Sequence, residues 1–154
     1  MLSIPLLIKK LSKKYPAITF EAGDDFHWSF DNQTITYQAT DPEAAAHVLH
    51  ELAHALLQHQ NYARDIELIG MERDAWTYAS TKLAGDFEVA IDKDTVQSAL
   101  DSYRDWLHSR STCPRCTATG IETAKYHYHC LACEHDWRVN EARICSLRRY
   151  SIQK

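Results

Sequence analysis

Two pairs of cysteines place the strongest constraint on how this chain of 154 residues can fold. The segments "CPRC" (113–116) and "CLAC" (130–133) form a CxxC-x13-CxxC pattern. Two such pairs at this separation can bring four thiolates to the corners of a tetrahedron, which is the arrangement of a closed structural zinc site. We therefore expect a zinc ribbon with one structural Zn²⁺, in which residues 121–130 form a β-hairpin arm. Its expected ligands are Cys113, Cys116, Cys130 and Cys133.

The compartment of a protein decides whether its cysteines bind metal or form disulfides. All five cysteines lie after residue 112, whereas those of a secreted disulfide scaffold would be spread through the chain. Residues 1–16 contain an apolar patch, but no basic stretch precedes it and no small-residue cleavage site follows it, as a signal peptide would require. No run approaches the roughly 18 apolar residues of a membrane span. We therefore expect a cytoplasmic protein with reduced thiols and no membrane partner, and we expect Cys145 to be a small core residue.

The histidine-rich segment "HVLHELAHALLQH" (47–59) is the second feature that limits the possible folds. It follows "TDPEAA" (40–45), in which Thr40 or Asp41 can cap a helix and Pro42 suits its first turn. Alanine, leucine and valine surround the histidines, as in a helix that packs into a core. The segment therefore predicts a buried helix that runs to about Gln60.

Within this helix, "HELAH" (50–54) has the HExxH pattern of zinc proteases. His50 and His54 are four residues apart, so they share one helix face and can bind one ion. Glu51 is rotated by about 100° from His50, beside the ion, where it can take a proton from water. Zinc with three protein ligands and an open position lowers the pKa of its water to about 7. The pattern predicts a catalytic Zn²⁺ with Glu51 as general base.

The site needs a third protein ligand, and the neighbouring histidines do not supply one. On a continuing helix, His59 would point about 140° away from His54. His47 precedes His50 by three residues, and we expect it to be solvated or to lie beside the site without binding the ion. The pattern HExxHxxGxxH, which carries its own third histidine, is not present.

The segment "MERDAWTYASTKLAG" (71–85) offers two acidic candidates on a second helix. Glu72 shares a helical stripe with the apolar residues at 75, 76, 79 and 83, whereas Asp74 falls on the other side. A buried carboxylate requires a charge partner, which a metal ion would supply. We therefore predict Glu72 as the third ligand and keep Asp74 as the alternative. Two histidines and one carboxylate can also bind manganese or iron.

At these residues the chain resembles the ImmA/IrrE family of metallopeptidases. "HELAHALLQH" followed by "ERDAWTYA" is similar to the family's HExxH motif and its helix of the form E-x-E-A-x-x-x-A, and the resemblance spans about residues 1–90. It implies a zincin-like fold, a catalytic metal and cleavage of a regulatory protein, often a DNA-binding repressor. His50, His54 and Glu72 match the family's ligand positions, and Glu51 matches the catalytic one.

The chain departs from the family pattern at two positions of the second helix. Asp74 stands where the family usually has glutamate, and Trp76 stands where asparagine or aspartate is common. A second family with HExxH and a zinc ribbon, the SprT-like DNA-associated proteases, is similar in architecture but expects a further histidine as third ligand. The chain has no histidine between His59 and His108, which argues against that alternative. A third possibility is a binding module in which the HExxH domain is only a scaffold.

Charge is distributed unevenly and bears on possible partners. Residues 1–111 carry 10 basic against 17 acidic residues, whereas residues 112–154 carry 7 against 4. A positive surface beside aromatic side chains can bind nucleic acid, although a solvated strand face that docks substrate or packs on the first domain is the simpler interpretation. In the ribbon this surface would consist of Arg138, Arg143, Arg148, Arg149, Trp137 and Tyr150. His135 is a weaker alternative zinc ligand.

The remaining patterns predict the other elements. Residues 2–14 suggest a helix with Leu2, Leu6, Leu7 and Leu11 toward the core. Three short runs, 17–22, 25–31 and 33–38, resemble an antiparallel meander. Further helices are expected over about 63–84, with a break near Gly70, and from about 92 to His108. We therefore expect an α+β fold with a zincin-like metallopeptidase domain at 1–110 and a four-cysteine ribbon with its tail at 111–154.

Overall fold

The computed structural model describes residues 2–141 and 147–152. Contacts within the described residues divide the chain into two compact units. The first unit comprises Met1–Gln60 and Met71–Gln97, and the second comprises Asn61–Gly70 and Ser98–Lys154. The expected boundary between two domains at residue 110 stays a prediction.

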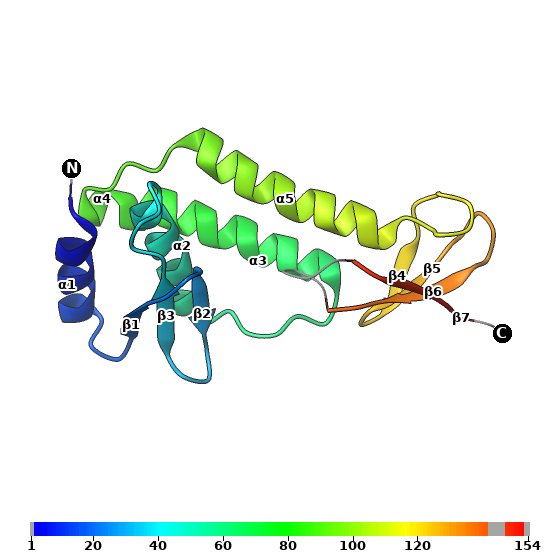
Figure 1. Cartoon of the computed structure of the whole chain (residues 1–154), viewed down its shortest axis with the longest axis horizontal. Helices are drawn as coiled ribbons and strands as arrows, with labels where there is room; N and C mark the ends of the chain where they lie inside the picture. Colours follow the sequence, from blue (N-terminus) through cyan, green and yellow to red (C-terminus); the bar gives the residue numbers. More distant parts are fainter. Residues whose placement is uncertain (1, 142–146, 153–154) are drawn as a thin grey trace. The chain divides into compact units, whose positions relative to one another are not determined.

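The first unit contains a small sheet with helices packed on it (Figure 1). Its complete elements are α1 (Ile4–Lys14), β1 (Thr19–Ala22), β2 (His27–Ser29), β3 (Thr34–Tyr37), α2 (Ala44–Leu56), a π-helical turn η1 (Ala79–Leu83) and α4 (Ala84–Phe87). The helices α3 (Asp65–Tyr78) and α5 (Lys93–Ser111) contribute residues to both units. Helix α3 continues through Gly70, so the break expected there is wrong, and the helical pattern changes only at Ala79.

The sheet of the first unit is mixed, and the expected antiparallel meander is therefore wrong. The described strands have the order β1-β3-β2, with β1 parallel and β2 antiparallel to β3. Ile35 in β3 is fully buried, and it pairs with Phe20 of β1 on one side and Trp28 of β2 on the other. Strand β3, at the centre of the sheet, thus has an apolar partner for Ile35 on each side. Alternation within each run predicts a strand, but the order of strands depends on this shared core.

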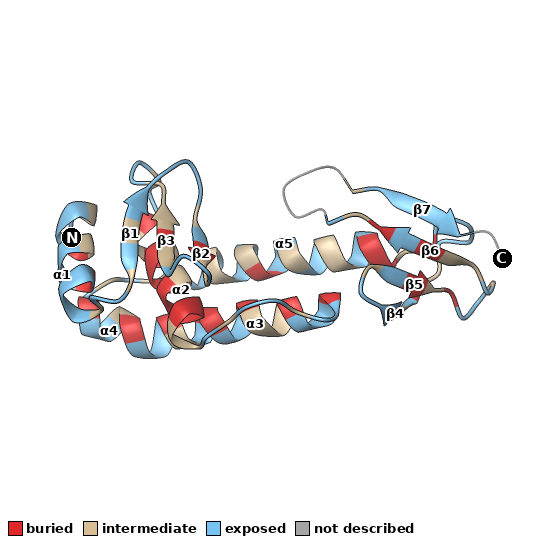
Figure 2. Cartoon of the chain, turned by 90° about the horizontal axis from the view of Figure 1, so that it is seen from below, coloured by how far each residue is buried: buried red, intermediate tan, exposed pale blue. Residues whose placement is uncertain are grey.

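Helix α2 is the central element of the first core. It packs on β2 and β3, and Figure 2 shows buried residues along most of its length. In α1, Leu7 and Leu11 are fully buried, as their four-residue spacing predicts. Leu6 is 46% exposed, contrary to expectation, because it is rotated by about 100° from Leu7. The two histidines of the HExxH motif thus lie on a helix held by the core.

The second unit contains a four-stranded antiparallel sheet among its described residues, and the hairpin arm expected at 121–130 forms its first two strands. Its strands are β4 (Ile121–Ala124), β5 (His127–His129), β6 (Asp136–Val139) and β7 (Arg149–Ile152), in this order. Tyr128 and Trp137 are buried and stack on each other, with ring centroids 5.6 Å apart. The α+β class is confirmed, with helices, a three-stranded mixed sheet and this C-terminal sheet. None of the helices in the described ranges is long and apolar enough to cross a membrane.

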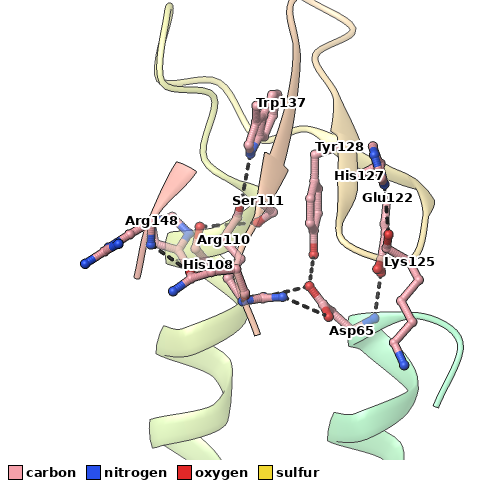
Figure 3. Close-up of polar contacts among 11 residues, drawn as sticks. Asp65, His108, Arg110, Ser111, Glu122, Lys125, His127, Tyr128, Trp137 and Arg148 are labelled. Atoms are coloured by element: carbon pink, nitrogen blue, oxygen red, sulfur yellow. Dashed lines mark hydrogen bonds and ion pairs between the residues drawn. The ribbon is translucent and has the colours of Figure 1, made fainter. Parts of the chain in front are cut away.

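A buried ion pair joins the helical ends of the second unit to its sheet. Asp65 and Arg110 are both fully buried, and Arg110 Nε donates to Asp65 Oδ2 over 2.8 Å. The hydroxyl of Tyr128 donates to the same oxygen over 2.6 Å, and Glu122 accepts the backbone N–H of Asp65 over 2.6 Å (Figure 3). Burial raises the pKa of Tyr128, and its hydrogen bond to Asp65 raises it further. Tyr128 therefore acts only as a donor here.

We expect Asp65→Ala to destabilise the second unit by about 3–5 kcal/mol, because it leaves the Arg110 guanidinium buried without its charge partner. Tyr128→Phe is the matched control, since it removes one hydrogen bond to the same carboxylate and leaves the ion pair, for a cost of about 1.5–3 kcal/mol. Urea unfolding of the full chain measures both. A smaller effect for Asp65→Ala than for Tyr128→Phe would show that the buried ion pair does not hold this unit together.

Candidate metal centres

The HExxH residues lie together on the inner face of α2. His50 and His54 are 4% and 7% exposed, and their Nε2 atoms are 3.1 Å apart. Glu51 Oε1 lies 4.0 Å from His50 Nε2. Ligand-type atoms of these three residues all lie within 4.8 Å of one another. The expected cluster of two histidines and a glutamate, a possible metal site, is therefore present.

Glu72 reaches the same point from α3. Its Oε2 atom is 2.9 Å from His50 Nε2, and its Oε1 atom is 3.4 Å from His54 Nε2. Glu72 is 3% exposed, whereas the side chain of Asp74 is 57% exposed and pairs with Arg73 over 3.0 Å. The helical stripe therefore has the orientation that the sequence predicts. Glu72, and not Asp74, therefore lies beside the two histidines.

The atoms of His50, His54 and Glu72 lie close enough together to share one small cation. A tetrahedral ion with bonds of 2.0–2.1 Å holds its ligand atoms about 3.3–3.4 Å apart. The two Nε2 atoms are 3.1 Å apart, and two different oxygens of Glu72 lie 2.9 Å from that of His50 and 3.4 Å from that of His54. Two of these separations have hydrogen-bond length, so the side chains would spread slightly around an ion. Two imidazoles and one carboxylate are the ligand set that zinc accepts in catalytic sites.

The charge state of Glu72 suits this role. Burial by itself would raise the pKa of the carboxyl group, but its hydrogen bonds to His50 and His54 outweigh that effect. The pKa of Glu72 is therefore held well below its usual range. The carboxylate is ionised at neutral pH and brings a negative charge to a buried place, where a cation would balance it.

Aromatic rings surround the site on one side. Trp76 stacks on His50, with ring centroids 4.2 Å apart and planes 18° from parallel. His47 lies between Phe26 and Trp76, at centroid distances of 4.8 and 5.5 Å, and burial lowers its pKa. His47 therefore packs beside the site. The sequence places Trp76 on the buried stripe, one turn after Glu72, but does not reveal its stacking on His50.

The four cysteines form the second candidate centre. The Sγ atoms of Cys113 and Cys133 are 3.8 Å apart and those of Cys116 and Cys130 are 3.5 Å apart, with all four within 4.8 Å. A disulfide would require about 2.05 Å, and these cysteines are free. Tetrahedral zinc with bonds of about 2.3 Å places its sulfur ligands about 3.8 Å apart. The expected four-cysteine cluster is confirmed, with the spacing of a closed zinc site.

The two cysteine pairs lie in turns with the same backbone conformation and hydrogen bonds. Each pair is followed by a residue with positive φ, Thr117 at 66° and Glu134 at 61°. The carbonyl of Cys113 accepts the N–H of Thr117, and the N–H of Cys113 donates to the carbonyl of Ala118. In the second pair, the carbonyl of Cys130 accepts the N–H of Glu134, and the N–H of Cys130 donates to the carbonyl of His135. Backbone N–H groups also donate to the sulfur of Cys130. The N–H of Cys133 has the largest effect, and the pKa of Cys130 is lowered to about 7. The second turn therefore favours the thiolate of Cys130, which is the form that binds metal, while burial raises the pKa of Cys133 to about 12.

The other ribbon residues singled out in the sequence are the aromatic and basic side chains and His135. Trp137 is fully buried, so it is not part of an exposed aromatic surface. Arg138 lies over the ring of Tyr150, 4.3 Å from its centroid. His135 is hydrogen-bonded to Ser151 over 3.0 Å, while the four thiols cluster without it. Arg143 and Cys145 lie outside the described residues.

We expect Cys113→Ser to lose the structural metal and to unfold the sheet of the second unit, because small zinc units gain much of their folding energy from the ion. Amide protection in β1–β3 should remain. The control is Arg115→Ala, which alters the same turn without removing a thiolate. Hydrogen exchange and zinc content of the full chain measure the effect. Unchanged protection of β5 and β6 in the serine variant would mean that the cysteines are not ligands.

Comparisons with protein-family models, with curated proteins and with solved structures gave no match.

Proposed function

We propose that the chain is a zinc-dependent metallo-endopeptidase of the zincin type, similar to the ImmA/IrrE family. In this proposal His50, His54 and Glu72 bind the catalytic Zn²⁺, and Glu51 is the general base. The observation that supports it most is the convergence of imidazole and carboxylate atoms from α2 and α3 at separations of 2.9–3.4 Å. The Glu51 carboxylate lies next to this point, 4.0 Å from His50 Nε2.

The residues divide the work of peptide hydrolysis. A bound Zn²⁺ supplies Lewis acidity, which lowers the pKa of water and polarises the scissile carbonyl group. Glu51 takes a proton from the attacking water while the oxygen of this water bonds to the carbonyl carbon. The carbon–nitrogen bond then breaks, and Glu51 passes the proton to the leaving nitrogen. The side chain of Glu51 is 13% exposed, so it combines access to substrate with a position fixed by α2.

The position of Glu72 favours this proposal over its rivals. A SprT-like protease would use a further histidine as third ligand, but the group that lies near Nε2 of both His50 and His54 is a carboxylate from α3. A pure binding module has no use for an ionised carboxylate buried against two buried histidines, although hydrogen bonds to these histidines keep it charged. A cofactor-free scaffold would be more stable with apolar residues there.

The proposed partner is a protein or peptide substrate, which by resemblance to the family is a regulatory DNA-binding protein. The cysteine cluster holds a structural Zn²⁺ in the second unit, and the ribbon serves in substrate recognition. Burial of Trp137 and the stacking of Arg138 on Tyr150 reduce the free aromatic and cationic surface, which favours a protein partner over nucleic acid. A cytoplasmic location remains a prediction.

Metal analysis combined with chelation tests the proposal. We expect two zinc ions per full chain, of which one is removed by a mild chelator while the four-thiolate zinc stays. Cleavage of a substrate protein, identified by comparing protein termini in lysates with and without the enzyme, should stop on chelation and return when zinc is added. A single, tightly held zinc would contradict the proposal and favour the binding module.

A further inference from the structure

The turn that ends α2 departs from the sequence-based expectation. The helix was expected to reach about Gln60, but it ends at Leu56, and Gln58 adopts the left-handed conformation with φ 59°. The N–H of His59 donates to the carbonyl of His54 over 3.0 Å, and that of Gln58 donates to Ala55 over 3.1 Å. These two bonds form a Schellman motif, in which the residue after the left-handed position folds back over the last helical turn.

This turn brings His59 onto His54 instead of leaving it about 140° away, as on a continuing helix. A Schellman motif commonly joins these two positions by an apolar contact. Here the contact is polar, because Nδ1 of His54 lies 2.8 Å from Nδ1 of His59. The two rings are 5.0 Å apart at an angle of 63°. The sequence gives no signal for this turn, since neither glycine nor asparagine occupies the left-handed position.

The two nitrogens of His54 therefore face different groups. Nε2 lies 3.1 Å from His50 Nε2 and 3.4 Å from Glu72 Oε1, at the candidate metal position. Nδ1 faces His59. A neutral imidazole that offers the Nε2 lone pair to a metal carries its proton on Nδ1. That proton can only be donated to His59 Nδ1 as an acceptor, which leaves the proton of His59 on its Nε2. With an ion at Nε2 of His54, this geometry selects one tautomer for both rings.

The other histidine is held differently. Nδ1 of His50 is buried and has no hydrogen-bond partner within residues 2–141 and 147–152. The orientation of His50 comes from its stacking on Trp76. The ring of His54 lies edge-on to the rings of His50 and His59. The hydrogen bond at its Nδ1 to His59 is a contact that His50 does not have, and it bears on the tautomer of His54.

We propose that His59 is a positioning residue for the catalytic metal. The left-handed turn at Gln58 places it beside His54. His59 accepts a hydrogen bond from His54 Nδ1 and so keeps the Nε2 lone pair directed at the ion. The inference rests on the proposed function, because it takes His54 as a metal ligand. Groups that orient a ligating histidine in this way typically change metal affinity by about 10–100-fold when they are removed.

Two nearly isosteric substitutions test the hydrogen bond. His59→Leu removes the acceptor, whereas His59→Asn retains an oxygen close to the former Nδ1 position. We expect the leucine variant of the full chain to bind zinc at the weaker site about 10–100-fold less tightly, measured by competition with a chelator. The asparagine variant should regain most of the affinity. Equal affinities of wild type and leucine variant, or equal losses in both variants, would overturn the inference.

Nitrogen-15 NMR of the zinc-loaded wild type provides a test that needs no variant. Long-range proton–nitrogen correlations should show His54 protonated on Nδ1 and His59 protonated on Nε2. A proton on Nδ1 of His59 with none on Nδ1 of His54 would overturn the inference. Because neither measurement uses cleavage, a wild type with the expected tautomers that cleaves no substrate supports the inference while it contradicts the proposed function. Absence of zinc from the site would overturn both.

Discussion

Glu51→Gln is expected to keep both metal ions and the fold while it lowers the rate of substrate cleavage by at least about 10²–10⁴-fold. Glutamine has nearly the same volume as glutamate but cannot accept the proton of the attacking water. The side chain lies beside the candidate metal position, with Oε1 4.0 Å from His50 Nε2, while Glu72 lies 2.9 Å from the same atom. Removing its charge therefore affects proton transfer more than metal binding.

The matched control is Glu43→Gln, which makes the same chemical change at an exposed position just before α2. It should cleave like the wild type. Cleavage rates on the identified substrate, zinc content and thermal unfolding should be measured for both variants. If Glu51→Gln cleaves as fast as the wild type, the peptidase assignment is wrong. If it loses its metal, Glu51 is a ligand and the roles of the two glutamates must be exchanged.

The parts of the candidate centres that could be predicted are those set by spacing along one element. Four residues separate His50 from His54, and helical geometry then places them on one face whatever the rest of the fold does. Glu72 was predicted inside and Asp74 outside because the apolar stripe of their helix has one buried side. The paired CxxC segments behave similarly, since thiolates three residues apart in a tight turn can already share an ion.

The parts that could not be predicted depend on contacts between distant segments. The order of β1, β3 and β2 follows from the position of Ile35 between Phe20 and Trp28. Gln58 adopts a conformation that glutamine seldom favours, so nothing in its identity indicates the end of α2.

Side-chain environments in the second unit show the same limit. Trp137 was expected near the surface, but its Nε1 donates to the carbonyl of Arg110, and the ring is buried in the small core. Asp65 and Arg110 are 45 residues apart, and no local pattern connects them. Such contacts exist only once the chain has packed.

The second large effect is expected for Glu72→Ala, which should lose the weakly held metal and the proteolytic activity together. Two histidines alone leave an ion with too few protein ligands, and the alanine also removes the negative charge that balances it. The structural zinc of the four cysteines should remain, so the zinc content should fall from two ions to one. Metal analysis after gel filtration measures this directly, without a known substrate.

Asp74→Ala provides the matched comparison, because it removes the other acidic side chain of the same helix. The exposed pair of Asp74 with Arg73 contributes little, so the change in stability should be within about 0.5 kcal/mol, with metal and activity retained. The opposite result, with metal lost from Asp74→Ala and kept by Glu72→Ala, would require α3 to be rotated by about 200°. Glu72 would then orient a histidine instead of binding the ion. Retention of both metals by both variants would mean that α3 supplies no ligand. The site would then lack the third protein ligand that zincin chemistry requires, and the binding module would become the better explanation of the HExxH helix.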